Sequence, residues 1–262
     1  MKVLWAIILS TFREAVRDKV LHGILFFAVA LILFSIVLGK LSLGEEFRVI
    51  MDVGLAGTSF FGVVTAIFLG STLVYKEVEK KTIYTVLARP LTRLLFLTGK
   101  YLGLLLTLLV LVAGLTAVLI LILAVNGGTP QPGFYLMVLM ICMEIALIAS
   151  VSLFFTSFST PFLSGLLTFG VFIIGRNLDI AIAYASSPKA GILGPIISTV
   201  ARVMPRFYLF YPTGRMVESS WSSIHEVFVE SQYIASALGY GILYTMFFFS
   251  VAALVLWRRN FV

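Results

Sequence analysis

One long apolar stretch without charged residues decides the fold class of the chain. Residues 101–125 read YLGLLLTLLVLVAGLTAVLILILAV, with no charged side chain among them. An α-helix rises about 1.5 Å per residue and the hydrocarbon core of a bilayer is about 30 Å thick, so about twenty apolar residues can span it. This stretch therefore predicts a transmembrane helix.

The composition of the whole chain agrees with that prediction. Of the 262 residues, 60% are hydrophobic and 12% are charged, whereas a soluble domain has about 45–50% apolar and about 25% charged residues. The 19 Lys and Arg residues outnumber the 12 Asp and Glu residues, and in a membrane protein such a surplus usually faces anionic headgroups. We therefore expect contact with membrane lipids and no binding of nucleic acid.

Five other segments are long and apolar enough to cross the membrane. They are residues 21–39, 53–74, 133–158, 161–175 and 233–256. The fifth crossing can extend beyond residue 175 through Arg176 and Asp179 to Ala185. The sequence thus predicts an all-α polytopic membrane protein with six transmembrane helices in one domain over residues 1–262.

The positions of the basic residues predict the orientation of the chain. Twelve lie before the first crossing, between the second and third, or after the sixth: Lys2, Arg13, Arg17, Lys19, Lys76, Lys80, Lys81, Arg89, Arg93, Lys100, Arg258 and Arg259. The other seven lie in the first and fifth connections. Because cytoplasmic loops carry the excess of Lys and Arg, both termini are expected in the cytoplasm and the long connection 176–232 on the outer side.

The first twenty residues have the pattern of an amphipathic helix. The apolar face carries Trp5, Ile8, Leu9, Phe12 and Val16, and the polar face carries Arg13, Glu14 and Arg17. The apolar run at residues 3–9 is too short for a signal peptide. We expect this helix to lie along the cytoplasmic headgroup layer. A simple extension of the first crossing is the alternative interpretation.

No catalytic or metal-binding motif occurs in the sequence. Its two histidines, His22 and His225, are expected on opposite sides of the membrane, and there is no HExxH, CxxC or pair of intramembrane aspartates. The phosphate-binding pattern GxxxxGK[ST] does not occur either. We therefore expect no metal site, no catalytic residue and no binding of ATP by this chain.

Glu144 is the one ionisable residue near the middle of a predicted crossing. An ionised side chain there costs roughly 2.5–3.5 kcal/mol on insertion scales, so we expect Glu144 to face the interior of the bundle or to be protonated. One interpretation is a substrate-path or gating residue. The other is an interhelical hydrogen bond to a Ser, Thr or Tyr side chain, worth about 1 kcal/mol.

The connection between the second and third crossings is the densest polar segment. Residues 75–93 read YKEVEKKTIYTVLARPLTR. Glu77 and Lys81 have the spacing of a stabilising i,i+4 pair, the apolar residues at 83, 86 and 87 share a face, and Pro90 ends the helical pattern. A short mixed-charge helix on the cytoplasmic face is suited to receive force from a partner protein.

This connection and its surroundings resemble the ABC-2 family of ABC-transporter permeases, in particular the branch with the permease of the nitrous-oxide reductase maturation system. That family carries E-x-E-x-x-T, a leucine-rich step, A-x-P-x-x-R, and G-K-Y-x-G at the entry to the third crossing. The matching residues are Glu77, Glu79, Thr82, Leu87, Ala88, Pro90, Arg93, Gly99, Lys100, Tyr101 and Gly103. Lys81 stands where a glycine is common. Weaker likeness covers residues 13–19, 157–161 and 204–207.

The resemblance implies the permease subunit of an ATP-driven exporter in the cytoplasmic (inner) membrane. Two copies of the chain would form a homodimer on two copies of a cytoplasmic ABC ATPase, which binds ATP and Mg, so that this chain needs no cofactor. Residues 77–88 would be the coupling helix, and the N-terminal helix, with Arg13, Glu14 and Arg17, a second contact. The ATPase-coupling residues so implied are Glu77, Glu79, Lys80, Lys81, Thr82, Arg89, Pro90 and Arg93.

The sequence allows more than one interpretation of the cargo, of the outer connection 176–232 and of the function. The scarcity of polar residues in the crossings favours a hydrophobic or amphipathic cargo, but a permease can also transmit force to a partner without passing cargo itself. Prolines divide the connection 176–232, which fits short interfacial helices forming an outer gate, contact with an outer-side partner protein, or a packed cap. A self-sufficient secondary transporter or channel, and a membrane scaffold without an ATPase partner, are the alternative functions.

Overall fold

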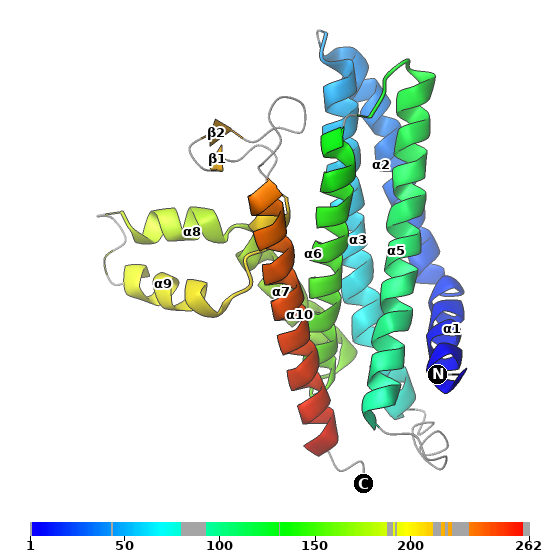
Figure 1. Cartoon of the computed structure of the whole chain (residues 1–262), viewed down its shortest axis with the longest axis vertical. Helices are drawn as coiled ribbons and strands as arrows, with labels where there is room; N and C mark the ends of the chain where they lie inside the picture. The colour runs from blue at the N-terminus through cyan, green and yellow to red at the C-terminus, as the bar shows by residue number, and fades with distance from the viewer. Residues whose placement is uncertain are drawn as a thin grey trace.

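The computed structural model describes residues 2–42, 44–79, 93–130, 132–187, 191, 193–211, 216–217, 220–221 and 231–258. Its helices are α1 (Lys2–Val16), α2 (Lys19–Leu41), α3 (Glu46–Glu79), α5 (Arg93–Val125), α6 (Pro132–Thr156), α7 (Pro161–Arg176), α8 (Leu178–Ala185), α9 (Leu193–Val203) and α10 (Ser231–Arg258). A short 3-10 helix, η2 (Phe207–Phe210), and two paired two-residue strands, β1 (Met216–Val217) and β2 (Ser220–Trp221), precede α10. The architecture is a helical bundle (Figure 1).

Five of these helices, α2, α3, α5, α6 and α10, are each long and apolar enough to cross a membrane. They lie at the positions that the sequence predicts, although α3 continues to Glu79, past the predicted end of the second crossing at residue 74. A sixth crossing exists if α7 and α8 together count as one broken span, since they are bent by 59°. The described chain therefore has five or six candidate spans.

The bend between α7 and α8 lies within the region where the sequence allows the fifth crossing to extend through Arg176 and Asp179 to Ala185. α7 ends at Arg176, and the backbone N–H of Asn177 donates to the carbonyls of Ile173 and Ile174. The Asn177 side-chain amide also donates to Ile173 O at 2.9 Å. Asparagine side chains compete with the helix for backbone groups in this way, which explains why the helix direction changes at this residue.

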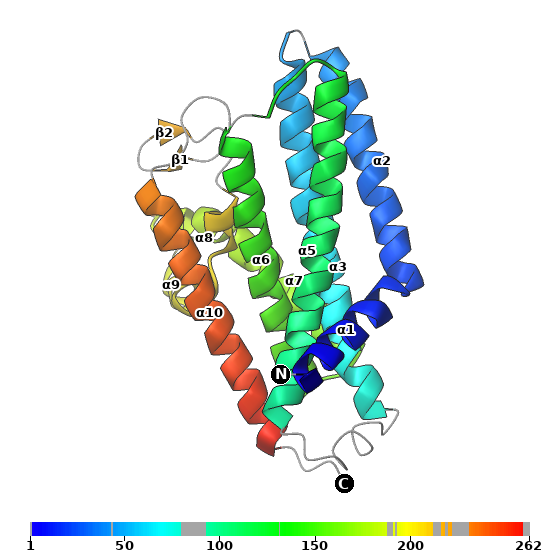
Figure 2. The same cartoon turned by 45° about the vertical axis from the view of Figure 1, so that its right-hand side comes forward.

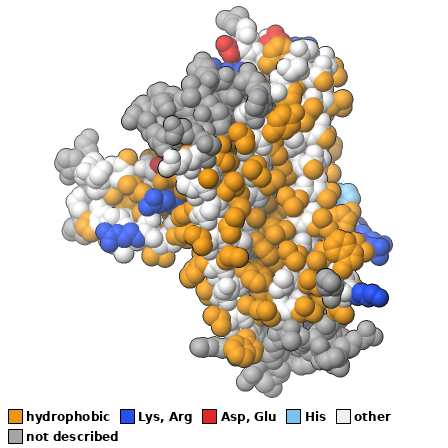
Figure 3. Space-filling view, in the orientation of Figure 1, with side chains coloured by type: hydrophobic (Ala, Val, Ile, Leu, Met, Phe, Trp, Pro, Cys, Tyr) orange, Lys and Arg blue, Asp and Glu red, His pale blue; other side chains and the backbone are white. Residues whose placement is uncertain are grey.

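The spans differ in how much protein surrounds them. α3 and α6 are the most buried candidate spans, and α10 is the most exposed. Figure 2 shows α2 and α10 at opposite edges, with both chain termini at one end of the bundle, where α3 ends and α5 begins. Apolar side chains cover the visible flank, while Lys and Arg side chains show beside α1 and near α9 (Figure 3). A flank of this kind is suited to contact with lipid.

Glycines set the close packing of α3 against its neighbours. A Cβ atom added at Gly57 would lie 2.6 Å from Leu31 of α2, and one at Gly70 would lie 2.6 Å from the Ser152 hydroxyl of α6. At Gly54 and Gly62 it would overlap side chains of α5 and α6. The absence of a side chain at these four positions therefore lets α3 approach α2, α5 and α6 closely.

Candidate functional site

The most buried charged group of the described chain is the carboxylate of Glu144 in α6, which has no exposed surface. Ser59 of α3 donates its hydroxyl to Glu144 Oε2 at 2.8 Å, and Arg176 donates to Glu144 Oε1 at 2.5 Å. The same guanidinium nitrogen of Arg176 donates to Ser59 Oγ at 3.1 Å. The predicted hydrogen bond to a hydroxyl is present, together with an ion pair that the sequence did not predict.

Aromatic rings complete the surroundings of Arg176. Its Cζ atom lies 4.6 Å from the ring centroid of Tyr211 and 5.6 Å from that of Phe172, within the range of cation–π attraction. Burial, with a smaller contribution from the nearby Asp52 carboxylate, raises the pKa of Tyr211, so its phenol stays protonated at neutral pH. We name Ser59, Glu144, Phe172, Arg176 and Tyr211 the bend cluster.

The bend cluster joins four parts of the fold at one point. It connects α3 and α6 to the last turn of α7, directly before the 59° bend, and to the residue that follows η2. A buried ion pair of this kind adds little net stability, but the loss of one partner leaves an uncompensated charge. The arrangement therefore ties the end of α7, directly before the bend, to α3 and α6.

A second group of polar side chains lies where α6 and α7 meet α3. Thr156 Oγ1 lies 2.8 Å from Ser164 Oγ and donates to Gly70 O at 3.2 Å, and Ser152 donates to Ile67 O at 3.3 Å. The sequence analysis missed these contacts. Their signal is the four-residue spacing of Ser152 and Thr156, which places both hydroxyls on one helix face.

The G-K-Y-x-G segment of α5 forms the contact with α1. A Cβ atom at Gly103 would lie 2.6 Å from Thr11 Cβ, so α1 packs directly on the α5 backbone. Lys100, with 4% of its side chain exposed, pairs with Glu14 at 3.4 Å. Tyr101 donates its hydroxyl to Ala146 O of α6 at 3.0 Å. We call the packing of Thr11 on Gly103, together with the pair of Glu14 and Lys100, the α1–α5 contact.

α1 is a helix separate from α2. It ends at Val16, and the Asp18 carboxylate accepts a hydrogen bond from Val20 N at the start of α2. Its buried residues are Ile8, Thr11 and Ala15, whereas Trp5, on the predicted apolar face, is 61% exposed. The side facing the protein is therefore rotated from the predicted apolar face, and Figure 2 shows α1 running obliquely across α5.

Most of the residues predicted to contact an ATPase lie outside the described side chains. Glu77 and Glu79 belong to the last turn of α3 and Arg93 begins α5, but their side chains are not described. Lys80, Lys81, Thr82, Arg89 and Pro90 lie outside the described residues. Arg13 and Arg17, at the end of α1, are exposed. The coupling role of these residues stays a prediction.

Among the described residues, no group of three or more His, Cys, Asp or Glu side chains could hold a metal ion. The candidate spans are long and apolar, and their buried polar side chains bind to one another inside the bundle. These features define a multi-pass membrane protein. Residues 5–259 match the family described as ABC-2 family transporter protein. The chain therefore belongs to the ABC-2 transporter family.

Members of this family are membrane transport components that are not themselves catalytic, and they generally work with a cytoplasmic ABC ATPase. A comparison with curated protein sequences gives no match. The narrower resemblance to the nitrous-oxide reductase maturation branch stays a prediction.

Proposed function

We propose that this chain is the permease subunit of an ATP-driven ABC-2 exporter in the cytoplasmic (inner) membrane. In this proposal two copies form a homodimer and rest on two copies of a separate ATPase, which binds ATP and Mg. The observation that carries the proposal is the family match over residues 5–259. The expected orientation, with both termini in the cytoplasm, is supported by the twelve Lys and Arg residues that the sequence carries before the first crossing, between the second and third, and after the sixth. Figure 2 shows both termini at one end of the bundle, where α3 ends and α5 begins.

The ATPase is proposed to act through two contacts at this end. Residues 77–88 form the coupling helix, and the exposed Arg13 of α1 and Arg17, directly after α1, form the second contact. Because α1 lies directly on the backbone of α5 and is tied to it by Glu14 and Lys100, a push on α1 reaches α5 without an intervening loop. ATP-driven closure of the ATPase pair would then move the spans.

The cargo is proposed to be hydrophobic or amphipathic, unless the chain transmits force to an outer-side partner. An open cavity of about 450 Å³ between α3 and α7 supports an apolar cargo. It is lined mainly by apolar side chains, among them Ile67, Phe68, Leu166 and Phe169. Pockets of this size and character commonly take small apolar ligands.

Purification from the native host in mild detergent, followed by mass spectrometry of the copurifying proteins, tests this proposal. We expect a P-loop ATPase in equal copies with this chain, and its loss in a Glu77→Lys, Glu79→Lys variant. A Glu45→Lys, Glu46→Lys variant makes the same charge change at the opposite end of α3 and should retain the ATPase. If no ATPase copurifies while dimers persist, the proposal fails and an independent transporter or a scaffold is favoured.

A further inference from the structure

The helices α8 and α9 form a packed pair that projects sideways from the bundle (Figure 1). We call this pair the arm. The backbone N–H of Arg206, three residues after α9, donates to the Tyr240 hydroxyl of α10 at 3.0 Å. The arm is therefore tied to the spans at its base, while its tip, between the end of α8 and the start of α9, points away from them.

The arm begins midway between the two ends of the bundle. Arg176, the last residue of α7, pairs with Glu144, which lies in the middle of α6, a candidate span. Since α6 has 25 residues, Glu144 lies about 18 Å from either end of this helix. Figure 1 shows the arm level with the middle of the bundle. The arm therefore lies at the depth of the acyl chains.

Two arginines of the arm are poorly suited to lipid at this depth. Arg202 of α9 and Arg206 are both exposed, and no ion pair joins either guanidinium to a carboxylate of the described chain. Half of the hydrocarbon core is about 15 Å thick, which is longer than an arginine side chain, so neither guanidinium reaches the headgroups. Charged groups at this depth face protein or a water-filled space.

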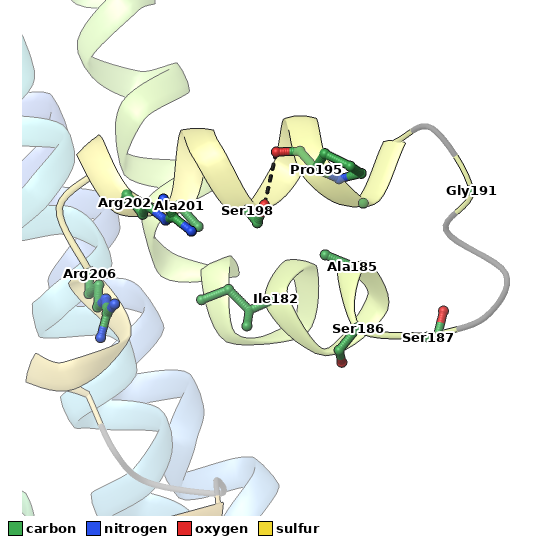
Figure 4. A pocket seen from close by; sticks show the side chains of 11 residues that line it. Ile182, Ala185, Ser186, Ser187, Gly191, Pro195, Ser198, Ala201, Arg202 and Arg206 are labelled. Atoms are coloured by element: carbon green, nitrogen blue, oxygen red, sulfur yellow. Dashed lines mark hydrogen bonds between the residues drawn. The ribbon is translucent and has the colours of Figure 1, made fainter.

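The cavity between α8 and α9 is suited to water. Its volume is about 580 Å³, and Figure 4 shows Arg202 and Arg206 at its end nearest to the bundle, with Ser186 and Ser187 toward the tip. Both serines donate their hydroxyl protons to carbonyls of α8, so their oxygens are left as acceptors. A roomy cavity with such polar groups holds water. Water at the depth of the acyl chains needs a protein wall against lipid.

The backbone at the tip of the arm also needs a partner other than lipid. The first N–H groups of α9 (Leu193–Val203) have no hydrogen-bond partner within the helix, and acyl chains offer none. Backbone of this kind is tolerated at membrane depth only where it is buried in protein or lines a water-filled cavity. A single copy surrounded by lipid does not meet this condition.

Apolar faces beside the arm indicate which protein covers it. Phe162, Leu166 and Ile173, at the spacing of one face of α7, are 82%, 57% and 46% exposed, and Ile196 and Val203 of α9 are 55% and 74% exposed. In a two-fold dimer the same patch of both copies meets, so apolar surface lies on apolar surface. Because each copy has the same uncovered arm, one such interface covers both arms at once.

We propose that the arm lies between two copies of this chain, where the second copy and the water between the copies replace lipid around Arg202 and Arg206. The exposed face of α7 and the apolar side of α9 contact the second copy, and the two guanidinium groups face the water. This inference rests on the homodimer of the proposed function, and it adds which face of the chain forms the interface.

Site-specific photocrosslinking of the full chain in membranes of its native host tests the interface. The photoreactive amino acid benzoylphenylalanine replaces Ile196, and mass spectrometry identifies what it captures. We expect a product of two copies of this chain. Leu243, near the middle of α10 and 69% exposed, is the matched control at similar depth and should capture no protein. Both positions are exposed, so both proteins should fold normally, which their melting temperatures check.

Thiol labelling tests the water. In a Cys142→Ala background, Arg202→Cys should react with a charged methanethiosulfonate reagent at least about tenfold faster than Leu243→Cys, because only a hydrated thiol ionises and meets the reagent. The purified dimer is used for both variants. Equally slow labelling of the two cysteines would show that Arg202 does not face water and would overturn the proposal.

Blue native electrophoresis of the same membranes shows whether dimers exist, which separates the two possible failures. If dimers are present but position 196 captures no second copy, or captures a different protein, the inference fails while the homodimer stands. Capture of a second copy from position 243 would place the interface on another face and would also overturn the inference. If no dimers form, the homodimer of the proposed function fails, and the inference fails with it.

Discussion

Two ion pairs join distant parts of this chain, and their surroundings differ. In the bend cluster, Glu144 is fully buried and Arg176 has 21% of its side chain exposed, with a hydroxyl and two rings around it. In the α1–α5 contact, Lys100 has 4% of its side chain exposed but Glu14 has 38%. The carboxylate of the first pair is fully buried, whereas the carboxylate of the second is partly exposed.

The difference in burial suggests that the bend cluster stays fixed, whereas the α1–α5 contact can rearrange. Charges in a low-dielectric interior interact strongly and depend on each other, whereas an exposed partner can be replaced by water or headgroups. The bend cluster should therefore hold the architecture in all states of the protein. The α1–α5 contact lies at the end proposed to meet the ATPase, where a weaker link permits adjustment.

The largest effect is expected for Glu144→Ala. Removal of the carboxylate leaves the Arg176 guanidinium without its buried partner, which should lower the free energy of unfolding by about 3–5 kcal/mol. Reversible unfolding of the detergent-solubilised protein in SDS measures this change. A Glu144→Leu, Arg176→Leu variant removes both charges and should recover most of the stability. Wild-type stability of the single variant would contradict a structural role for the pair.

A smaller loss is expected when the α1–α5 contact is overpacked by Gly103→Leu. The added side chain overlaps Thr11 and should destabilise the protein by about 1–3 kcal/mol and loosen α1. Trypsin cleavage at Arg13 and Arg17 should become faster, as followed by gel electrophoresis. Gly114→Leu is the matched control in the same helix, because a Cβ atom there meets nothing within 4 Å. Equal cleavage rates in the two variants would argue against close packing of α1.

Tyr211→Leu tests the aromatic part of the bend cluster. Loss of the ring over Arg176 should cost about 0.5–2 kcal/mol, the range of a cation–π contact, while the ion pair with Glu144 remains. The same SDS unfolding assay gives the change. Tyr135→Leu, at a 55% exposed aromatic position, serves as the control and should have a smaller effect. The opposite order would show that the ring does not stabilise Arg176.

The smallest effect is expected for Glu14→Gln. Because Glu14 is partly exposed, its pair with Lys100 should contribute about 1 kcal/mol or less, and the contribution should decrease as salt is added. Stability of wild type and variant is measured at low and high ionic strength. The effect of Glu144→Gln should be nearly independent of salt. Equal salt dependence of the two variants would remove the distinction between the two pairs.

The sequence predicted the fold at the level of helices but not the contacts of the bend cluster. The predicted crossings agree with α2, α3, α5, α6 and α10, because long apolar runs are a local property of the chain. A hydroxyl partner for Glu144 was also expected. Arg176 was not expected as a partner, since it seemed to continue a crossing. Only the packing of α7 against α6 brings its guanidinium to Glu144, which is 32 positions away in the sequence.

The faces of the helices show what only the tertiary structure decided. The sequence predicted an apolar face of α1 from Trp5 and its neighbours and placed the helix along the headgroup layer. It did not predict that α1 packs through Thr11 on the backbone of α5. In a bilayer, lipid is as apolar as a protein core, so hydrophobicity alone determines which segments enter the membrane. Which faces meet is decided by glycines that admit a neighbouring helix and by buried polar groups that need a partner, and both depend on residues far apart in the sequence.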